Sequence, residues 1–250
     1  MKQHFVKTSN YHLFLLMLAT VESQAPMEGR SMYVHGGPGE GKTRTLDFIG
    51  AQRNAIYIEG MPGMTVAYLR EFLAHRLGCP GGTRFTQEEA IKKAFFERVP
   101  MVIFDEAQFG LNKKSECLDY LRCVCEKAGS VLIMVTHTSE KHRFGEHKLA
   151  HISTRISAVV EFKPANLADC VLYLEELCEV SVDEEIAKKV LSQSGGRYRL
   201  MASACRMLED IATGMDKPPT KGGPKPQLTG AEVKGMMLCE NAMKSLRNGK

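Results

Sequence analysis

The sequence predicts an α/β fold in which helices cover both faces of a parallel sheet, followed by a small helical domain. Two runs, 101–104 and 131–135, are apolar without interruption, which is typical of strands buried on both faces. Segments with helical periodicity, such as 65–77, alternate with such runs, and this alternation favours a parallel sheet. After Pro164 three helical patterns follow one another.

The individual elements follow from apolar spacing and from helix start signals. Thr86 with Glu89, and Ser181 with Glu184, have the capping-box spacing that begins a helix. We expect strands at 32–35, 56–58, 101–104, 131–135 and 158–162. We expect a helix that follows Thr43 and runs to about Gly50, and further helices at 65–77, 115–128, 166–179, 182–194 and 199–213, with one more that begins near Thr86.

Three parts are expected along the chain. Residues 1–164 are expected to form the α/β core with an N-terminal extension, and residues 165–214 the helical domain. The stretch 217–226 is rich in Pro, Gly and Lys, which is typical of a linker. Residues 215–250 are therefore expected to form a linker and a basic tail.

The composition is that of a globular protein. Of the 250 residues, 44% are hydrophobic and 25% are charged, which argues against a disordered or collagen-like chain. The net charge of +4 comes from residues 216–250, which contain seven Lys and Arg but only three Asp and Glu. The rest of the chain is neutral, so a nucleic-acid surface there has to be a local patch.

The opening apolar run and the cysteines argue against a membrane protein and a zinc protein. Residues 13–19 are apolar, but this run is far shorter than the ~20 residues of a membrane span, so we expect no membrane partner. The eight cysteines include no C-x-x-C pair, and Cys123 and Cys125 have no His at a zinc-ligand spacing. We expect buried, reduced thiols in a cytoplasmic protein.

Residues 36–43 carry the strongest functional signal. They fit the pattern G-x-x-x-x-G-K-[ST] between a strand and a helix, which predicts a phosphate-binding loop. Glycines let the backbone amides curl around a phosphate, and the N-terminus of the helix faces the same anion. Lys42 is expected to reach the β- and γ-phosphates of ATP, and Thr43 to place its hydroxyl on Mg²⁺. The expected nucleotide-binding residues are Gly36, Gly37, Pro38, Gly39, Glu40, Gly41, Lys42, Thr43 and Thr45.

Two further strand ends carry polar residues. The apolar run 101–104 ends in Asp105 and Glu106, and two carboxylates at the end of a buried strand are costly unless a cation is present. We expect Asp105 to hold Mg²⁺ through water and Glu106 to polarise the attacking water. At the end of the run 131–135, Thr136 or His137 is expected to lie between the acids and the γ-phosphate.

These residues, in this order, resemble the AAA+ ATPases over roughly residues 30–213. In this resemblance the phosphate loop is Walker A, Asp105 and Glu106 are Walker B, and Thr136 or His137 is sensor 1. The resemblance implies a P-loop core with a parallel sheet, a small helical lid formed by 165–214, and Mg²⁺-dependent ATP hydrolysis.

Two arginines also resemble functional arginines of that family. Arg155, in the segment 151–156, is similar to the arginine finger, which acts in the nucleotide site of a neighbouring subunit; Arg143 is the alternative. Arg199, at the start of the last lid helix, is similar to sensor 2, which contacts the γ-phosphate; Arg197 is the alternative. The resemblance therefore implies catalytic roles for Glu106, Lys42, Arg155 and Thr136.

Within AAA+, the chain resembles the small DNA-transposition ATPases of the MuB and TnsC type. The features that carry this resemblance are the segment 5–10 before the phosphate loop, the strand 56–59 leading into the helix that ends at Leu77, and the compact lid. This resemblance implies ATP-dependent homo-oligomers, either filaments or rings, on duplex DNA, and a transposase that is recruited to the marked DNA and stimulates hydrolysis.

The residues that touch DNA are predicted only as candidates. Lys113 and Lys114 follow the acidic pair in a loop that could face a central channel, and Lys92 and Lys93 lie on the preceding helix. The lysines of the tail are a further candidate. No recognition helix or zinc motif is present in the sequence, so base-specific recognition is not expected.

Two other functions stay open at this point. A helicase loader of the DnaC type shares the same core and prefers single-stranded DNA. A solitary AAA+ scaffold or signalling ATPase binds no nucleic acid, and the neutral charge of residues 1–215 is compatible with it.

Overall fold

The computed structural model describes residues 1–111, 115–144, 150–218 and 224–239, which form two compact units. Leu13–Gly36 and Lys42–Phe162 make up one unit, which we call the sheet unit. Met1–His12, Gly37–Gly41 and Lys163–Lys250 make up the other, which we call the helical unit.

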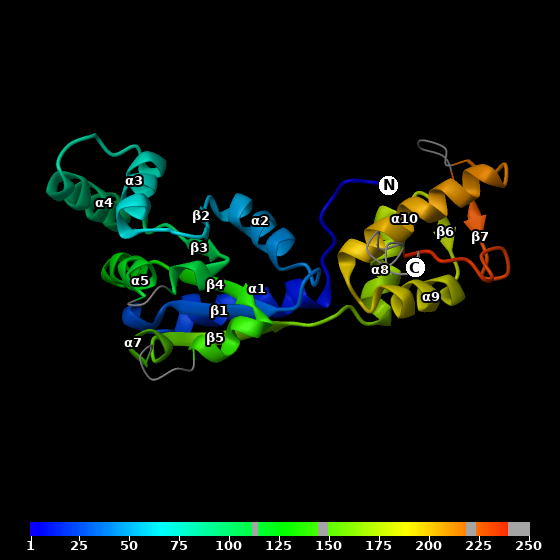
Figure 1. Cartoon of the computed structure of the whole chain (residues 1–250), viewed down its shortest axis with the longest axis horizontal. Helices are drawn as coiled ribbons and strands as arrows, with labels where there is room; N and C mark the ends of the chain where they lie inside the picture. The colour runs from blue at the N-terminus through cyan, green and yellow to red at the C-terminus, as the bar shows by residue number, and fades with distance from the viewer. Residues whose placement is uncertain (112–114, 145–149, 219–223, 240–250) are drawn as a thin grey trace. The chain divides into compact units, whose positions relative to one another are not determined.

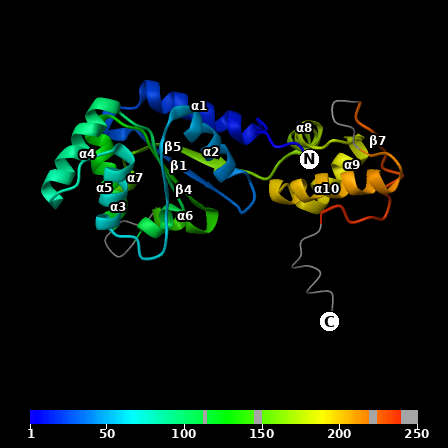
Figure 2. The same cartoon turned by 90° about the horizontal axis from the view of Figure 1, so that it is seen from above.

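Figure 1 labels the strands and all helices but α6, which is labelled in Figure 2. The strands are β1 (Ser31–Gly36), β2 (Ile56–Glu59), β3 (Val102–Asp105), β4 (Leu132–His137), β5 (Ile156–Phe162), β6 (Ser181–Val182) and β7 (Gln227–Leu228). The helices are α1 (Ser9–Gln24), α2 (Lys42–Arg53), α3 (Val66–Leu77), α4 (Arg84–Arg98), α5 (Glu116–Ala128), α6 (Lys141–Phe144), α7 (Ala150–Ser153), α8 (Leu167–Leu177), α9 (Glu184–Ser194) and α10 (Tyr198–Gly214). Short 3-10 turns are η1 (Met27–Gly29), η2 (Ala107–Gly110) and η3 (Thr138–Glu140).

The sheet unit is built on five parallel strands in the order β2-β3-β4-β1-β5. Every residue of β1 and β3 is buried, whereas the edge strand β5 alternates between buried and exposed positions. The central strands therefore pack on both faces, as their uninterrupted apolar runs predict. The predicted fold class, a parallel sheet flanked by helices, is confirmed.

Helices cover both faces of this sheet. On one face, side chains of α3, α4 and α5 form a single buried cluster with Phe104 of β3 and Met134 of β4. Figure 2 shows α1 and α2 together on one side of the strands, with α6 on the other. Leu46 and Ile49 of α2 are buried, like Phe14 and Leu18 of α1.

Two helices begin at other residues than the capping boxes predict. Thr83, not Thr86, is the N-cap of α4, and its hydroxyl accepts a hydrogen bond from the Thr86 amide. Asp183, not Ser181, is the N-cap of α9, because its carboxylate accepts from the Ile186 amide at 2.9 Å. In both cases another good capping residue lies within three positions, and spacing alone does not choose between them.

The end of α4 has an unusual backbone conformation. Val99 caps this helix with φ 42°, and its amide donates to the Phe95 carbonyl. Glycine normally occupies such a left-handed position, because the side chain of any other residue crowds its own backbone there.

The helical unit has its own core. Buried residues of α8, α9 and α10 pack together with Val6 of the N-terminal segment. The Met1 ammonium group pairs with Glu209 at 2.7 Å, which ties the start of the chain to α10. The expectation that residues 1–164, 165–214 and 215–250 form three parts stays a prediction.

Residues 224–239 contribute to the core of the helical unit, although the sequence indicates a linker and tail in this region. Strand β7 pairs with β6, and Leu228, Val233 and Leu238 are fully buried in the core of the unit. These apolar residues lie just beyond the Pro, Gly and Lys run, so the composition of that run does not extend to them.

The eight cysteines are free thiols, most of them buried, as expected. Burial raises the pKa of the Cys170 and Cys239 thiols to about 11, so both are protonated at neutral pH. Within the described ranges, no helix combines the length and the apolar character that crossing a membrane requires.

Candidate functional site

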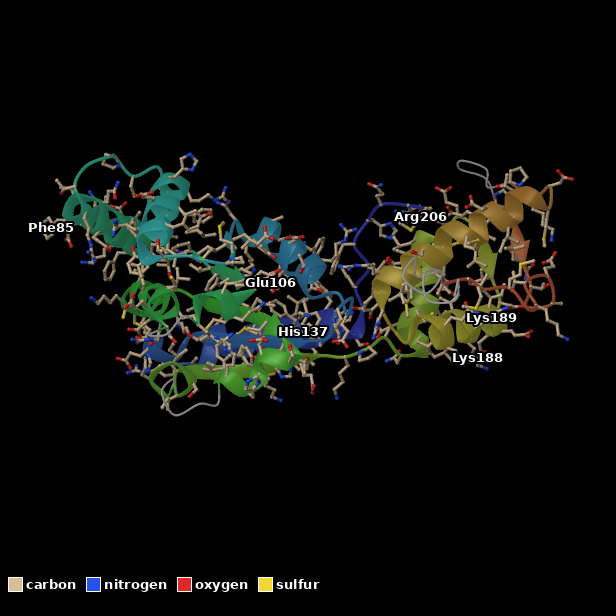
Figure 3. The ribbon with its side chains drawn as sticks, in the orientation of Figure 1. Phe85, Glu106, His137, Lys188, Lys189 and Arg206 are labelled. Atoms are coloured by element: carbon tan, nitrogen blue, oxygen red, sulfur yellow. The ribbon has the colours of Figure 1, made fainter. Side chains whose placement is uncertain are left out.

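Three neighbouring strands of the sheet unit end at one edge, and the predicted site residues lie there. Strand β4 lies between β3 and β1, and because all three are parallel, their carboxyl ends meet. These ends are Asp105, His137 and Gly36. Figure 3 labels Glu106 and His137, which lie close to this edge at the ends of β3 and β4. Open parallel sheets bind ligands at the carboxyl ends of their strands.

The first turn of α2 contacts this edge. Lys42 begins the helix, and its Nζ donates to the Gly36 carbonyl at 2.8 Å. Thr43 Oγ1 donates to Asp105 Oδ2 at 3.0 Å. The structure thus brings together the two residues that the sequence assigns to Mg²⁺, although 62 positions separate them. Thr45 is buried, with 2% of its surface exposed.

The two acidic residues have different surroundings. Asp105 is 6% exposed, and its carboxylate accepts hydrogen bonds from the Tyr57 hydroxyl at 2.7 Å and from the Glu106 amide at 2.9 Å. Glu106 is exposed and has the left-handed φ of 51°. Its carboxylate accepts a hydrogen bond from the Gln108 side-chain amide. Asp105 is therefore held rigidly, while the Glu106 carboxylate faces solvent.

The oxygen donors at this edge fit a magnesium ion. Mg²⁺ binds carboxylate and hydroxyl oxygens and usually keeps several waters or phosphate oxygens as ligands. Thr43 and Asp105 present a hydroxyl and a carboxylate within hydrogen-bond distance of each other. A site that completes its coordination with nucleotide phosphates matches this donor set.

The end of β4 distinguishes the two candidates for sensor 1. Thr136 is 1% exposed, and its hydroxyl donates to the His137 carbonyl at 3.1 Å. The Tyr33 hydroxyl lies 2.7 Å from Thr136 Oγ1. His137 is half-exposed, and its Nδ1 contacts Ser139. His137 is therefore the residue at this strand end that is open to a ligand.

In the helical unit, the segment Gly37–Gly41 of the predicted phosphate loop packs against the start of α10. The Tyr198 amide donates to the Gly39 carbonyl at 2.8 Å. A Cβ built on Gly39 would lie 3.4 Å from Arg197 Cβ and 3.8 Å from Arg199 Cβ. Both arginines are exposed. The two candidates for sensor 2 therefore flank the loop, and this contact does not choose between them.

Asn10 anchors the same segment. It is 7% exposed, and its Nδ2 donates to the Glu40 carbonyl at 3.2 Å and to the Lys163 carbonyl at 2.8 Å. The Glu40 carboxylate in turn accepts from the Gly37 amide. These bonds fix the backbone of the loop on both sides of Gly39.

A family model described as an AAA domain matches residues 25–144, the part of the chain that contains β1 to β4. Its match begins before the predicted phosphate loop and ends after the acidic pair. The fold is that of an AAA+ P-loop core. No curated protein matches the sequence.

Solved structures support this AAA+ fold. Cdc6p from Pyrobaculum aerophilum matches with a TM-score of 0.60 and 17% identity, covering 88% of this chain, and the chain spans 65% of that protein. The Aeropyrum pernix ORC2 protein has a TM-score of 0.62 and 16% identity, over 88% of this chain and 67% of that one. Domain III of the Thermotoga maritima replication initiation protein DnaA has a TM-score of 0.52 and 16% identity, and the match covers 86% of this chain and 89% of that domain.

The predicted arginine finger of the AAA+ core is partly exposed. The Arg155 side chain is 43% exposed, and its Nη1 lies 4.0 Å from Glu126 Oε1. The alternative, Arg143, binds Glu140 at 2.9 Å and the Leu111 carbonyl at 2.7 Å. Arg155 has the longer and weaker contact, so it is the better placed of the two to reach another molecule.

Contact of Lys92 and Lys93 with DNA stays a prediction. Lys92 pairs with Glu89 at 2.8 Å, and Lys93 with Glu97 at 3.8 Å, both along α4. These ion pairs partly neutralise the positive patch that the sequence indicates. Lys113 and Lys114 lie outside the described residues.

Sequence reasoning missed Tyr57, Gln108 and Asn10. Tyr57 belongs to a predicted strand, but its contact with Asp105 depends on β2 and β3 being neighbours, which the sequence does not state. Gln108 follows the acidic pair after a single residue, Ala107, so its closeness to Glu106 in the sequence was available as a signal. Asn10 lies in the first turn of α1, and no local sequence pattern indicates its hydrogen bonds to the Glu40 and Lys163 carbonyls, which are far away along the chain.

Proposed function

We propose that this chain is an AAA+ ATPase that binds ATP with Mg²⁺ and hydrolyses it slowly. The observation that carries the proposal is the 3.0 Å contact between Thr43 of the phosphate loop and Asp105 of the acidic pair. This contact gathers the expected metal-binding oxygens at the carboxyl edge of the sheet, next to Lys42. When bound, Mg²⁺ neutralises the negative charge that develops on the transferring phosphoryl group.

The residues of the site divide the remaining work. Lys42 neutralises phosphate charge, and the exposed Glu106 carboxylate accepts a proton from the attacking water. His137, in preference to the buried Thr136, holds the γ-phosphate by hydrogen bonding. Arg199, or Arg197, binds the phosphates beside Gly39, and Arg155 acts in the site of a neighbouring subunit.

Replacing Lys42 tests the nucleotide site. Lys42→Ala removes the cation that the phosphates need, so nucleotide affinity should fall by about 100-fold, in proportion to the loss of a charged contact. Titration with a fluorescent ATP analogue measures this affinity. Arg44→Ala is the matched control, because Arg44 is a cationic residue that directly follows the predicted phosphate loop. If Lys42→Ala binds the nucleotide with the affinity of wild type, residues 36–43 are not a phosphate-binding loop.

We propose further that the chain regulates DNA transposition by assembling on duplex DNA in its ATP-bound state and recruiting a transposase. Support comes from the sequence resemblance to the MuB and TnsC type and from the exposed Arg155, which fits contact with a second copy. One copy makes few phosphate contacts, whereas an assembly adds many, so DNA binding depends on assembly. Hydrolysis then returns the assembly to single chains.

A helicase loader of the DnaC type is a second candidate. It is supported by the structural likeness to domain III of a replication initiation protein. Sedimentation with a non-hydrolysable ATP analogue separates the candidates. Large assemblies that require duplex DNA favour the transposition regulator, and a preference for single-stranded DNA favours the loader. Assembly that is the same with and without DNA indicates a scaffold or signalling ATPase that binds no nucleic acid.

A further inference from the structure

We propose that the acidic pair of the ATPase site is positioned by two residues, Tyr57 of strand β2 and Gly60, which directly follows that strand. Tyr57 orients the Asp105 carboxylate with its hydroxyl, and Gly60 holds the Glu106 backbone because it has no side chain. Both are positioning residues, since each acts through one of the acids. The inference rests on the proposed function, in which those acids serve Mg²⁺ and water.

The Tyr57 hydroxyl is part of a shared hydrogen-bond arrangement on Asp105. Tyr57 Oη donates to Oδ2 at 2.7 Å, and Thr43 Oγ1 donates to the same oxygen at 3.0 Å. The Glu106 amide donates to Oδ1 at 2.9 Å. Three donors from three segments therefore fix the rotation of one carboxylate. The Tyr57 bond is the shortest of the three.

The Tyr57 hydroxyl is the donor in this contact, because an ionised carboxylate such as that of Asp105 can only accept hydrogen bonds. Donors to a metal-binding carboxylate orient it and tune its affinity for the ion.

Gly60 acts on the other acid through close backbone contact. Its amide donates to the Asp105 carbonyl at 2.8 Å. A Cβ built on Gly60 would lie 2.3 Å from the Glu106 carbonyl oxygen and 3.0 Å from the Asp105 carbonyl oxygen. Since both obstacles are backbone atoms, no side-chain rotation relieves the clash, and a larger residue has to shift Glu106.

Glu106 is sensitive to such a shift because its backbone is already strained. Its φ of 51° is a left-handed conformation that a residue with a side chain adopts only when its surroundings enforce it. The Gly60 contact supplies part of that enforcement. Tyr57 of β2 thus positions the metal ligand, and Gly60, the residue after β2, positions the water-activating residue.

The Tyr57→Phe variant tests the first half of the proposal. It removes only the hydroxyl. Nucleotide affinity in the presence of a chelator should stay within twofold of wild type, whereas the Mg²⁺ concentration that gives half-maximal tightening of nucleotide binding should rise by about tenfold. Fluorescence titration with an ATP analogue measures both quantities without turnover. Tyr120→Phe is the matched control, since Tyr120 Oη donates to Glu88 at 3.3 Å in the same unit.

The Gly60→Ala variant tests the second half. It should lower kcat by about tenfold or more with little change in KM, because the water-activating group is displaced while the nucleotide contacts remain. Gly63→Ala is the control: Gly63 has φ 79° in the same segment, but a Cβ there would meet no atom within 4 Å. Circular dichroism and the melting temperature show whether each variant is folded.

The outcomes separate this inference from the proposed function. If the wild-type protein shows no Mg²⁺-dependent nucleotide binding, the proposed function fails. If the wild type binds and Tyr57→Phe has the Mg²⁺ dependence of wild type, the positioning role of Tyr57 is wrong. Equal kcat in Gly60→Ala and Gly63→Ala would likewise overturn the role of Gly60. Should Gly60→Ala fail to fold, Tyr57→Phe alone decides the proposal.

Discussion

At the scale of single residues, the two neighbouring acids differ in how firmly they are held. Asp105 is buried and receives three hydrogen bonds, so its carboxylate has one fixed orientation. Glu106 is exposed and contacts the Gln108 amide. A rigid carboxylate suits a metal ligand, because a side chain that is already fixed loses little conformational entropy when it binds the ion. A solvent-facing carboxylate suits the handling of water.

The Glu106→Gln variant should separate binding from hydrolysis. The amide keeps the size of the side chain but no longer accepts a proton, so turnover should fall by about 100-fold or more while nucleotide affinity stays near wild type. ATP-dependent assemblies should then persist. Phosphate release and light scattering check the two effects, and Glu140→Gln serves as the control. Normal turnover would exclude Glu106 as the base.

A pH dependence is expected from the buried His35 at the end of β1. Burial, with a contribution from Lys141, lowers its pKa below the ordinary value, so the folded chain binds fewer protons than the unfolded chain. Stability is then fully present above the unfolded pKa and falls as the pH drops below it, by about 1.4 kcal/mol for each unit of pKa difference. The melting temperature of His35→Leu should fall less than that of wild type between pH 7 and pH 5. Parallel curves for the two proteins would contradict this assignment, and exposed His142 provides a comparison.

At the scale of elements, the link between β5 and α8 constrains the turn before α10. Gly196 has φ 74°, and a Cβ there would lie 2.6 Å from Pro164 Cβ and 2.8 Å from the Ala165 amide nitrogen. The Ala165 amide also donates to the Gly196 carbonyl at 2.9 Å. The chain entering the helical unit and the turn that begins α10 are therefore in direct backbone contact.

Gly196→Ala should destabilise the helical unit by about 2 kcal/mol or more, since left-handed strain adds to a backbone clash. The neighbouring Gly195→Ala is the control. It has φ 57°, but a Cβ there would meet no atom within 4 Å, so only the strain of about 1–2 kcal/mol applies. Denaturant unfolding followed by hydrogen exchange in α10 measures both. Equal losses would show that the close contact does not matter.

The sequence predicts the elements well where burial on two faces leaves a simple pattern. All five strands of the sheet lie where apolar runs indicate, and α3 begins after Thr65 and ends at Leu77 as its spacing predicts. The exact start of α4 depends on a choice between Thr83 and Thr86, two good capping residues that the spacing pattern does not distinguish. Lys42, Thr43 and Asp105 follow from local motifs. The roles of Tyr57 and Gly60 do not follow from local motifs, because no local pattern predicts which strands are neighbours in the sheet.

At the scale of the whole molecule, the prediction concerns contact between copies. Arg155 is expected to complete the site of a neighbour, so Arg155→Ala should leave nucleotide binding near normal and lower hydrolysis. Mixing Arg155→Ala with Glu106→Gln tests this directly. Random assembly puts an intact Glu106 beside an intact Arg155 at about a quarter of the interfaces, so about a quarter of wild-type activity should return.

The mixing experiment has a built-in control, since each variant alone should be nearly inactive. Absence of recovery, with assembly confirmed by sedimentation, would show that Arg155 acts within its own chain or not at all. The contact between Arg155 and Glu126 gives a matched variant, Glu126→Gln, which should free the arginine and leave hydrolysis intact.

The C-cap of α4 shows that the stability of this chain is below the maximum that its fold allows. Val99 is 47% exposed and lies just before the amino end of β3, at the opposite edge of the sheet from Asp105. Its left-handed backbone costs about 1–2 kcal/mol that glycine would not incur. Val99→Gly is therefore a starting point for a more heat-resistant protein, and it does not alter the edge of the sheet that carries Asp105.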